Sequence, residues 1–99
     1  MILHTINKSP FNHTALADCI GIIGDDDGLL LLEDGVYALA PGTAGAALLQ
    51  QARERGIGIY AIADDIVHRG IDSSPIAEAV DYTKFVALTL EYATVHSWY

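Results

Sequence analysis

The sequence has few of the basic residues that direct binding to nucleic acid or to an anionic membrane requires. Of its 99 residues only 5 are Lys or Arg, against 13 Asp or Glu, so the formal net charge is −8 at pH 7. Affinity for nucleic acid comes largely from phosphates neutralised by Lys and Arg, and anionic lipids attract basic segments for the same reason. We therefore expect no direct contact with nucleic acid and none with a membrane.

Cysteine is also scarce. Cys19 is the single cysteine of the sequence, which excludes an internal disulfide and suits a reducing compartment. No apolar run is long enough to span a bilayer, and residues 1–5 lack the basic start and cleavage site of a signal peptide. These features predict a cytoplasmic protein.

Motifs for cofactors and metals are absent from the sequence. The glycines between residues 21 and 28 lack both the Lys-Ser/Thr of a phosphate loop and the strand-first order of a dinucleotide fingerprint. The later histidines have no metal-ligand spacing, and one cysteine offers no second soft ligand. His4, in an apolar N-terminal stretch, is expected to be a hydrogen-bonded core group. We expect no cofactor and no metal.

Apolar residues, in contrast, are abundant. The sequence is 52% hydrophobic and only 18% charged. A chain of this size has much surface for its volume, so this much apolar content indicates that part of it lies against another chain. We expect one domain over residues 1–99 that is embedded in an oligomer.

Four consecutive leucines form the clearest structural signal. Leu29–Leu32 lie between Gly28 and Gly35 without any polar alternation, which indicates a strand covered on both faces, as in a parallel sheet flanked by helices. Glu33 and Asp34 follow where this strand should emerge, at the carboxyl edge where open α/β sheets usually place their ligands.

Strand and helix patterns alternate around this run. Further strands are expected at residues 2–6, 58–63, 76–80 and 94–99, and helices at 13–23, 44–55, 65–69 and from 81, with a helical turn over 36–40. Asn12 and Thr43 are the expected N-caps of the first two helices, and residues 25–28 a solvated turn. The pattern predicts an α/β fold, a single-domain three-layer sandwich with a mostly parallel sheet of about five strands.

Several segments together resemble the TusB/DsrH family. They are LHTINKSPF (Leu3–Phe11), LLLLEDGVYA (Leu29–Ala38), IYAIADDIVHRGI (Ile59–Ile71), VDYTKFVALT (Val80–Thr89) and VHSW (Val95–Trp98), in the order and spacing of that family. The resemblance covers nearly the whole chain. It is closer to DsrH, because Cys19 falls where DsrH-type members carry a cysteine and many TusB-type members do not.

This resemblance implies a cytoplasmic subunit of a sulfurtransferase complex that passes persulfide sulfur between cysteines. The complex would be a heterohexamer with TusC/DsrF-like and TusD/DsrE-like subunits, and would deliver sulfur to a TusE/DsrC-like acceptor. Its endpoint would be the 2-thiouridine of the tRNA wobble position or dissimilatory sulfur oxidation. The principal persulfide cysteine belongs to the TusD/DsrE-like subunit, so this chain would serve mainly in assembly.

Two other functions stay open from the residues alone. One is a purely structural interaction subunit without chemistry. The other is a flavodoxin-like module that binds a nucleotide or a flavin, because a fold by itself does not decide function.

Cys19 is the candidate catalytic residue, as an auxiliary persulfide carrier, because sulfur relay needs a nucleophilic thiolate. Its place in the middle of a predicted helix, in register with Leu16 and Ile23, is equally typical of a packed small hydrophobe. The neighbouring Asp18 would disfavour the thiolate. Both interpretations stay open.

Four further residues are candidates for binding or interface contacts. Lys8, the only cation in the first fifty residues, could attract an anionic partner or be a solvated loop lysine. Asp34 could form a paired acid site with Glu33, or cap a turn. Trp98 and Tyr99 could anchor an interface, or close the edge of the domain's own core.

Overall fold

The computed structural model contains one sheet in which all five strands pair in parallel, in the order β4-β3-β2-β1-β5. The structure describes residues 1–72 and 75–98. The strands are β1 (Ile2–Ile6), β2 (Gly28–Leu31), β3 (Gly58–Ile62), β4 (Glu78–Val80) and β5 (Thr94–Trp98), and the helices are α1 (Ala15–Ile22), α2 (Ala44–Glu54), α3 (Ala63–His68), α4 (Tyr82–Glu91) and the 3₁₀ helix η1 (Glu33–Leu39). The predicted five-stranded α/β fold is confirmed.

The middle strand of the sheet is β2, which holds the leucine run. Leu29, Leu30 and Leu31 are fully buried. Successive side chains of a strand point to opposite faces, and accordingly Leu29 and Leu31 belong to one hydrophobic core and Leu30 to another. The unbroken apolar run therefore reflects a strand with a core on each side.

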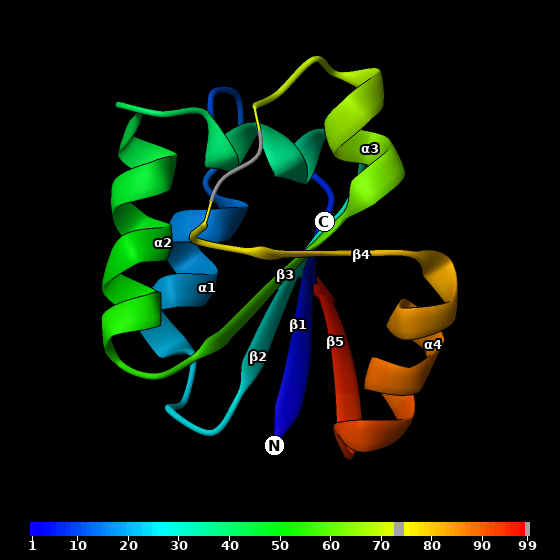
Figure 1. Ribbon diagram of the computed structural model, residues 1–99. Helices are drawn as coiled ribbons and strands as arrows, with labels where there is room; N and C mark the ends of the chain where they lie inside the picture. The colour runs from blue at the N-terminus through cyan, green and yellow to red at the C-terminus, as the bar shows by residue number, and fades with distance from the viewer. Residues whose placement is uncertain (73–74, 99) are drawn as a thin grey trace.

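Helices cover both faces of this sheet, which gives the predicted three layers (Figure 1). The core on one face includes Leu16 of α1, Leu49 of α2 and Val36 of η1. The core on the other face includes Leu88 of α4 and Tyr92, which follows that helix. The carboxyl ends of β2 and β3 lead into the short helices η1 and α3.

The single helix α4 connects the two edges of the sheet. It follows β4 at one edge and precedes β5 at the other, crossing the face opposite α1 and α2 (Figure 1). Tyr92 lies against Gly28, where an added Cβ would be 2.5 Å from the Tyr92 hydroxyl. Glycine is therefore required at the start of β2 so that the end of α4 can pack on the sheet.

Some boundaries differ from the sequence prediction. The first helix begins at Ala15 with Thr14 at its N-cap, not at His13 after Asn12. The backbone N–H groups of Asn12 and His13 donate instead to the Ser9 carbonyl, at 3.2 and 3.1 Å, so these residues form a turn before the helix. Thr43, in contrast, caps α2 as predicted and accepts the Ala46 N–H.

The short elements also shift. The predicted turn over residues 36–40 is η1, which begins at Glu33 after the single residue Leu32 that follows β2, and β4 covers only three residues of the predicted 76–80. The helix predicted at 65–69 begins at Ala63, immediately after β3. None of the helices in residues 1–72 and 75–98 has the length and apolar character that a membrane crossing requires.

Candidate functional site

The carboxyl edge of the sheet carries a hydrogen-bonded cluster of charged side chains. Asp65, at 9% exposed, lies in α3 and accepts the backbone N–H of Glu33 through Oδ2 at 2.7 Å. Arg69 donates to Asp65 Oδ1 at 3.4 Å and, through Nε, to Asp34 Oδ1 at 2.9 Å. The hydrogen bond to Asp34 raises the pKa of the Arg69 guanidinium above its ordinary value. This cluster joins the exit of β2 to α3.

The same edge holds an unusual backbone conformation. Glu33 has φ of +49°, in the left-handed region that residues with a Cβ rarely adopt, at a cost of about 1 kcal/mol or more. Gly35 follows, and a Cβ there would lie 2.1 Å from the Ile6 carbonyl oxygen. The chain thus turns tightly over the end of β1, and the Asp65 carboxylate holds the turn through the Glu33 N–H.

Asp34 is placed at this edge, where the sequence predicted it. Its carboxylate is 57% exposed and ion-paired with Arg69, whereas Glu33 contributes its backbone. Asp65 and Arg69 were not singled out from the sequence. The sequence did contain one indication of them. The Asp64-Asp65 pair follows β3, at the same edge of the sheet to which Glu33 and Asp34 were assigned.

Cys19 lies away from this edge, in the core between α1 and the sheet. It is fully buried. Burial, with a smaller contribution from Asp27, raises the pKa of its thiol to about 12. At neutral pH the thiol therefore keeps its proton. In this conformation Cys19 has the properties of a packed small hydrophobe, not of an exposed nucleophile.

Trp98 belongs to a second polar network, which runs from the carboxyl end of β5 through β1 to the turn before β2. Its indole Nε1 donates to His4 Nδ1 at 3.0 Å, and His4 Nε2 lies 3.0 Å from Asp27 Oδ2. Because Nδ1 accepts a hydrogen bond, Nε2 of the buried His4 carries the proton and donates to Asp27. The expectation that His4 is a hydrogen-bonded core group agrees with this arrangement.

Asp27 is the centre of this second network. Its carboxylate also accepts the backbone N–H groups of Ile2 and Gly24, each at 2.9 Å. Burial alone would raise the pKa of Asp27, but the hydrogen bonds from Gly24, His4 and Ile2 together lower it below the ordinary value. Residues 25–28 were predicted to form a solvated turn. Asp27, the third residue of that turn, is instead partly buried and anchors the turn by hydrogen bonds.

The remaining predicted site residues do not form one site with Cys19. Lys8 is partly exposed just beyond the end of β1, and Tyr99 lies outside the described residues. Within the described ranges, no group of three His, Cys, Asp or Glu side chains could hold a metal ion. Asn7 Oδ1 is buried at the same carboxyl edge without a hydrogen-bond partner. Lys8, Asp34 and Trp98 thus share one end of the sheet, and Cys19 does not join them.

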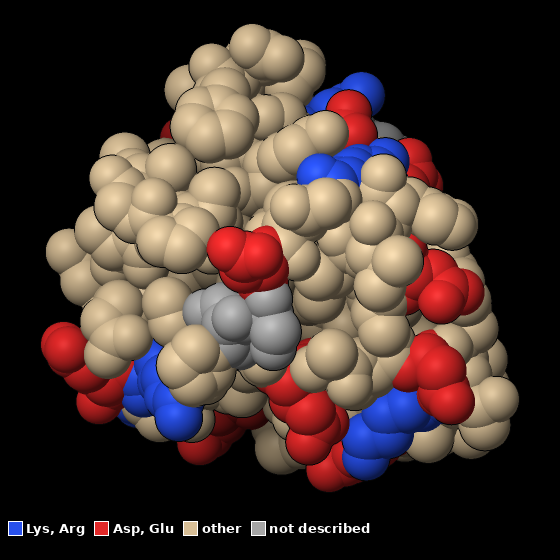
Figure 2. Space-filling view, turned by 45° about the horizontal axis from the view of Figure 1, so that its top comes forward, with Lys and Arg blue, Asp and Glu red and all other residues tan. Residues whose placement is uncertain are grey.

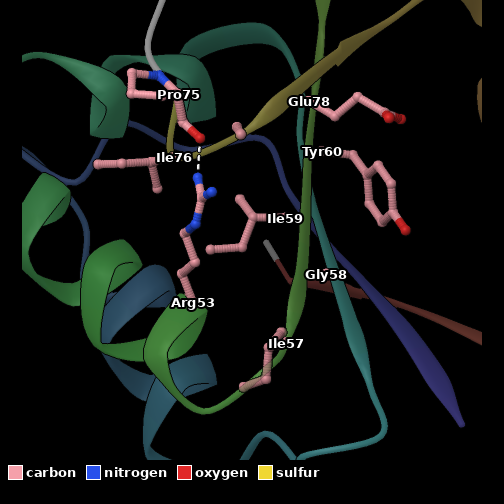
Figure 3. Close-up of a pocket in the computed structure, with 9 residues that line it drawn as sticks. Arg53, Ile57, Gly58, Ile59, Tyr60, Pro75, Ile76 and Glu78 are labelled. Carbon is pink, nitrogen blue, oxygen red and sulfur yellow. Dashed lines mark hydrogen bonds between the residues drawn. The ribbon is translucent and has the colours of Figure 1, made fainter.

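A cavity of about 340 Å³ lies between α2, β3 and β4. In Figure 3 the Arg53 side chain reaches from α2 to the carbonyl of Pro75, to which it donates a hydrogen bond, with Ile59 and Ile76 beside it. Tyr60 points to the other side of β3. None of the predicted site residues lines this cavity. Arg53, Tyr60 and Glu78 are the polar residues among those that line it, and the others are apolar or glycine.

Figure 2 shows that the basic side chains on the face it presents lie beside acidic ones, with wide uncharged areas between these groups. Arg69 forms an ion pair with Asp34, and Arg55 forms one with Asp25 at 2.8 Å. Arg55 and Arg69 are therefore neutralised locally by neighbouring carboxylates.

These features define a small parallel α/β protein with a charged carboxyl edge and a buried thiol. A family model described as "DsrH like protein" matches residues 8–95. The chain is 35% identical to Protein TusB of Escherichia coli (strain SMS-3-5 / SECEC) and 33% identical to Protein TusB of Shigella flexneri, over 98% of this chain and 100% of each relative. The chain belongs to the DsrH-like family, and the predicted TusB/DsrH resemblance is confirmed.

Solved structures show the same fold at low sequence identity. The crystal structure of the ychN protein from E. coli superposes with a TM-score of 0.83 at 18% identity, covering 98% of this chain and 97% of that one. Protein Tm0979 from Thermotoga maritima gives a TM-score of 0.66 at 20% identity, covering 92% and 93%. The closer likeness to the DsrH branch that Cys19 suggested stays a prediction, since both relatives named above are TusB proteins.

Proposed function

We propose that this chain is a cytoplasmic subunit of a sulfur-relay complex and that it works mainly through assembly with TusC/DsrF-like and TusD/DsrE-like subunits. The observation that carries the proposal is membership of the DsrH-like family over nearly the whole chain. Identity to TusB proteins favours thiolation of the tRNA wobble position as the endpoint, since the resemblance associates the TusB branch with that modification.

The environment of Cys19 supports an assembly role over a carrier role. A relay cysteine must be reached by a partner's persulfide and must ionise. Cys19 is fully buried and its thiol has a pKa raised to about 12. We propose that persulfide sulfur travels between cysteines of the partner subunits and the TusE/DsrC-like acceptor, while Cys19 packs α1 against the sheet.

Coexpression of the full chain with the TusC/DsrF-like and TusD/DsrE-like subunits of the same organism tests the assembly role. We expect the three proteins to elute together from a sizing column, and sulfur transfer to a TusE/DsrC-like acceptor to fall at least about tenfold when this chain is omitted. A chain that elutes alone beside the other two subunits would contradict the proposal.

Replacement of Cys19 separates the two roles. Cys19→Ala removes the thiol and leaves an apolar side chain, so we expect sulfur transfer by the complex to stay within about twofold of wild type. The cost should be one of stability, on the order of 1 kcal/mol for a small core truncation. Loss of transfer by an intact complex would instead establish Cys19 as a carrier.

A further inference from the structure

The two edges of the sheet differ in how far they are protected against pairing with another strand. β4 has three residues, carries the exposed Glu78 and follows Pro75, which Arg53 holds by a hydrogen bond. Short length, charge and proline are the usual protections of an edge strand. The β4 edge is therefore protected against pairing with a strand of another chain.

β5 has none of these protections. It has five residues, pairs with β1 along its full length and contains no charged residue and no proline. Residues 94–97 are exposed. Within residues 1–72 and 75–98 no other strand pairs with its outer side. Its free backbone N–H and C=O groups can be satisfied in full by an extended strand of another chain.

The helix that precedes β5, α4, carries an exposed apolar stripe. Tyr82, Val86 and Leu90 are spaced four residues apart, on one side of the helix, and are 53%, 59% and 82% exposed. The outer side of a surface helix is ordinarily charged or polar. α4 leads into β5 through only two residues, and both elements lie at the same side of the molecule (Figure 1). Val95 of β5 is a further exposed apolar side chain, at 42%.

The amino end of this surface is acidic. Asp27 accepts the N–H of Ile2, and Ile2 pairs with Thr94 at the start of β5, so the acidic turn of residues 25–27 lies one strand away from the free edge. Glu91 precedes β5 by three residues, and no Lys or Arg occurs in residues 85–98. A partner with basic residues at this end is attracted, whereas a second copy brings another net charge of −8.

We propose that the free edge of β5, with Tyr82, Val86 and Leu90 of α4, docks an edge strand of a different and less acidic protein subunit. The docked strand extends the five-stranded sheet, and basic side chains of the partner face the turn of residues 25–27. This inference rests on the proposed function, in which TusC/DsrF-like and TusD/DsrE-like subunits are the partners. It adds which surface of this chain meets a partner and which charge that partner carries there.

The test uses the full chain coexpressed with those two subunits and compares two double variants. Leu90→Lys with Val95→Lys places charges on the proposed surface, and Ile22→Lys with Val67→Lys is the matched control, because Ile22 and Val67 are 70% and 74% exposed on α1 and α3. We expect the first pair to weaken binding at least about tenfold, as charge at the centre of an interface does. The control pair should change it less than about twofold.

A third variant examines the charge of the partner. Asp26 is exposed beside the anchored Asp27, and Asp26→Lys should weaken binding several-fold at low salt and less at high salt, because exposed charges are screened. Tighter binding by this variant would overturn the proposed charge of the partner. Circular dichroism of each isolated variant should match wild type, since all the replaced side chains are exposed.

The remaining outcomes separate this inference from the proposed function. An intact complex with the Leu90→Lys, Val95→Lys variant overturns the docking surface and leaves the proposed function standing. Equal loss in both double variants also overturns the surface, because the effect is then not local. Absence of a complex with wild type overturns the proposed function itself. If the wild-type chain forms a homodimer and only the Leu90→Lys, Val95→Lys variant is monomeric, a second copy of this chain occupies the edge. That result overturns the proposal that a different subunit docks there.

Discussion

Asp27 and Asp65 lie at opposite ends of the sheet, and each accepts one backbone N–H from a segment distant in sequence, Ile2 for Asp27 and Glu33 for Asp65. Asp65 holds the strained turn at Glu33 and pairs with Arg69, within residues 33–69. Asp27 accepts from Ile2 and Gly24 and reaches Trp98 through His4, so it joins the first strand, the turn before β2 and the last strand.

The difference between the two networks is one of range and of chemistry. The Asp65 network shapes a local turn and uses an arginine that stays charged at all ordinary pH values. The Asp27 network ties residues 2, 4 and 98 together and uses a neutral histidine as both donor and acceptor. We infer that the Asp27 network fastens β1 and β5 to the turn before β2, while the Asp65 network holds the conformation of one loop.

The largest effect should come from Asp27→Ala. This change removes the acceptor for two backbone N–H groups and leaves the buried His4 Nε2–H unpaired, so we expect a loss of about 3 kcal/mol in the free energy of unfolding. Urea denaturation of the isolated chain measures it. Asp34→Ala, at a 57% exposed carboxylate, is the control and should cost less than about 1 kcal/mol. Equal losses would contradict the central place given to Asp27.

Asp65→Ala should have the next largest effect, about 2 kcal/mol, because the Glu33 N–H loses its acceptor in a partly buried turn while Arg69 keeps Asp34. The companion change Glu33→Gly removes the left-handed strain and should recover part of that loss, about 0.5–1 kcal/mol. If Glu33→Gly destabilises the Asp65→Ala variant, the strain assigned to this turn is wrong.

Trp98→Phe should cost about 1 kcal/mol. The phenyl ring keeps most of the packing but cannot donate to His4 Nδ1, so one partly buried hydrogen bond is lost. Exchange of the β5 amide hydrogens should accelerate more than exchange in β3, because β5 is the strand that this bond anchors. Unchanged protection of β5 would show that the indole N–H does not fasten that strand.

The smallest effect at neutral pH concerns protonation of Asp27. Because its pKa is lowered in the folded chain, the unfolded chain binds more protons at acid pH, and stability falls as the pH drops. This contribution is fully present above about pH 4, the ordinary range of an aspartate, and is lost as the pH falls through the lowered pKa. Urea midpoints between pH 6 and pH 3 should therefore decline more steeply for wild type than for Asp27→Asn. Parallel declines would assign the acid sensitivity to other carboxylates.

Local sequence patterns were sufficient for the architecture. The uninterrupted Leu29–Leu32 run could only be covered on both faces, and the alternation of strands and helices leads to parallel pairing. Thr43 was predicted as an N-cap because a cap depends on the next three residues alone. Asn12 was not a cap, since the turn made by the Ser9 carbonyl competes with it.

The candidate site depended on the order of the strands. Strand order places β1 between β2 and β5, and only that placement brings His4 into contact with both Asp27 and Trp98. The same holds for Asp65 and the Glu33 N–H, which meet because β2 and β3 are neighbours. No periodicity within one segment carries such information.

By itself, the sequence determined the fold class, the buried central strand, the acidic charge and the family, because these depend on composition, local pattern and overall similarity. Tertiary structure alone decided that Cys19 is enclosed, that Asp27 anchors the sheet and that β5 presents a free edge. Each of these depends on contacts between residues far apart in the chain, which form only when the strands assume their order.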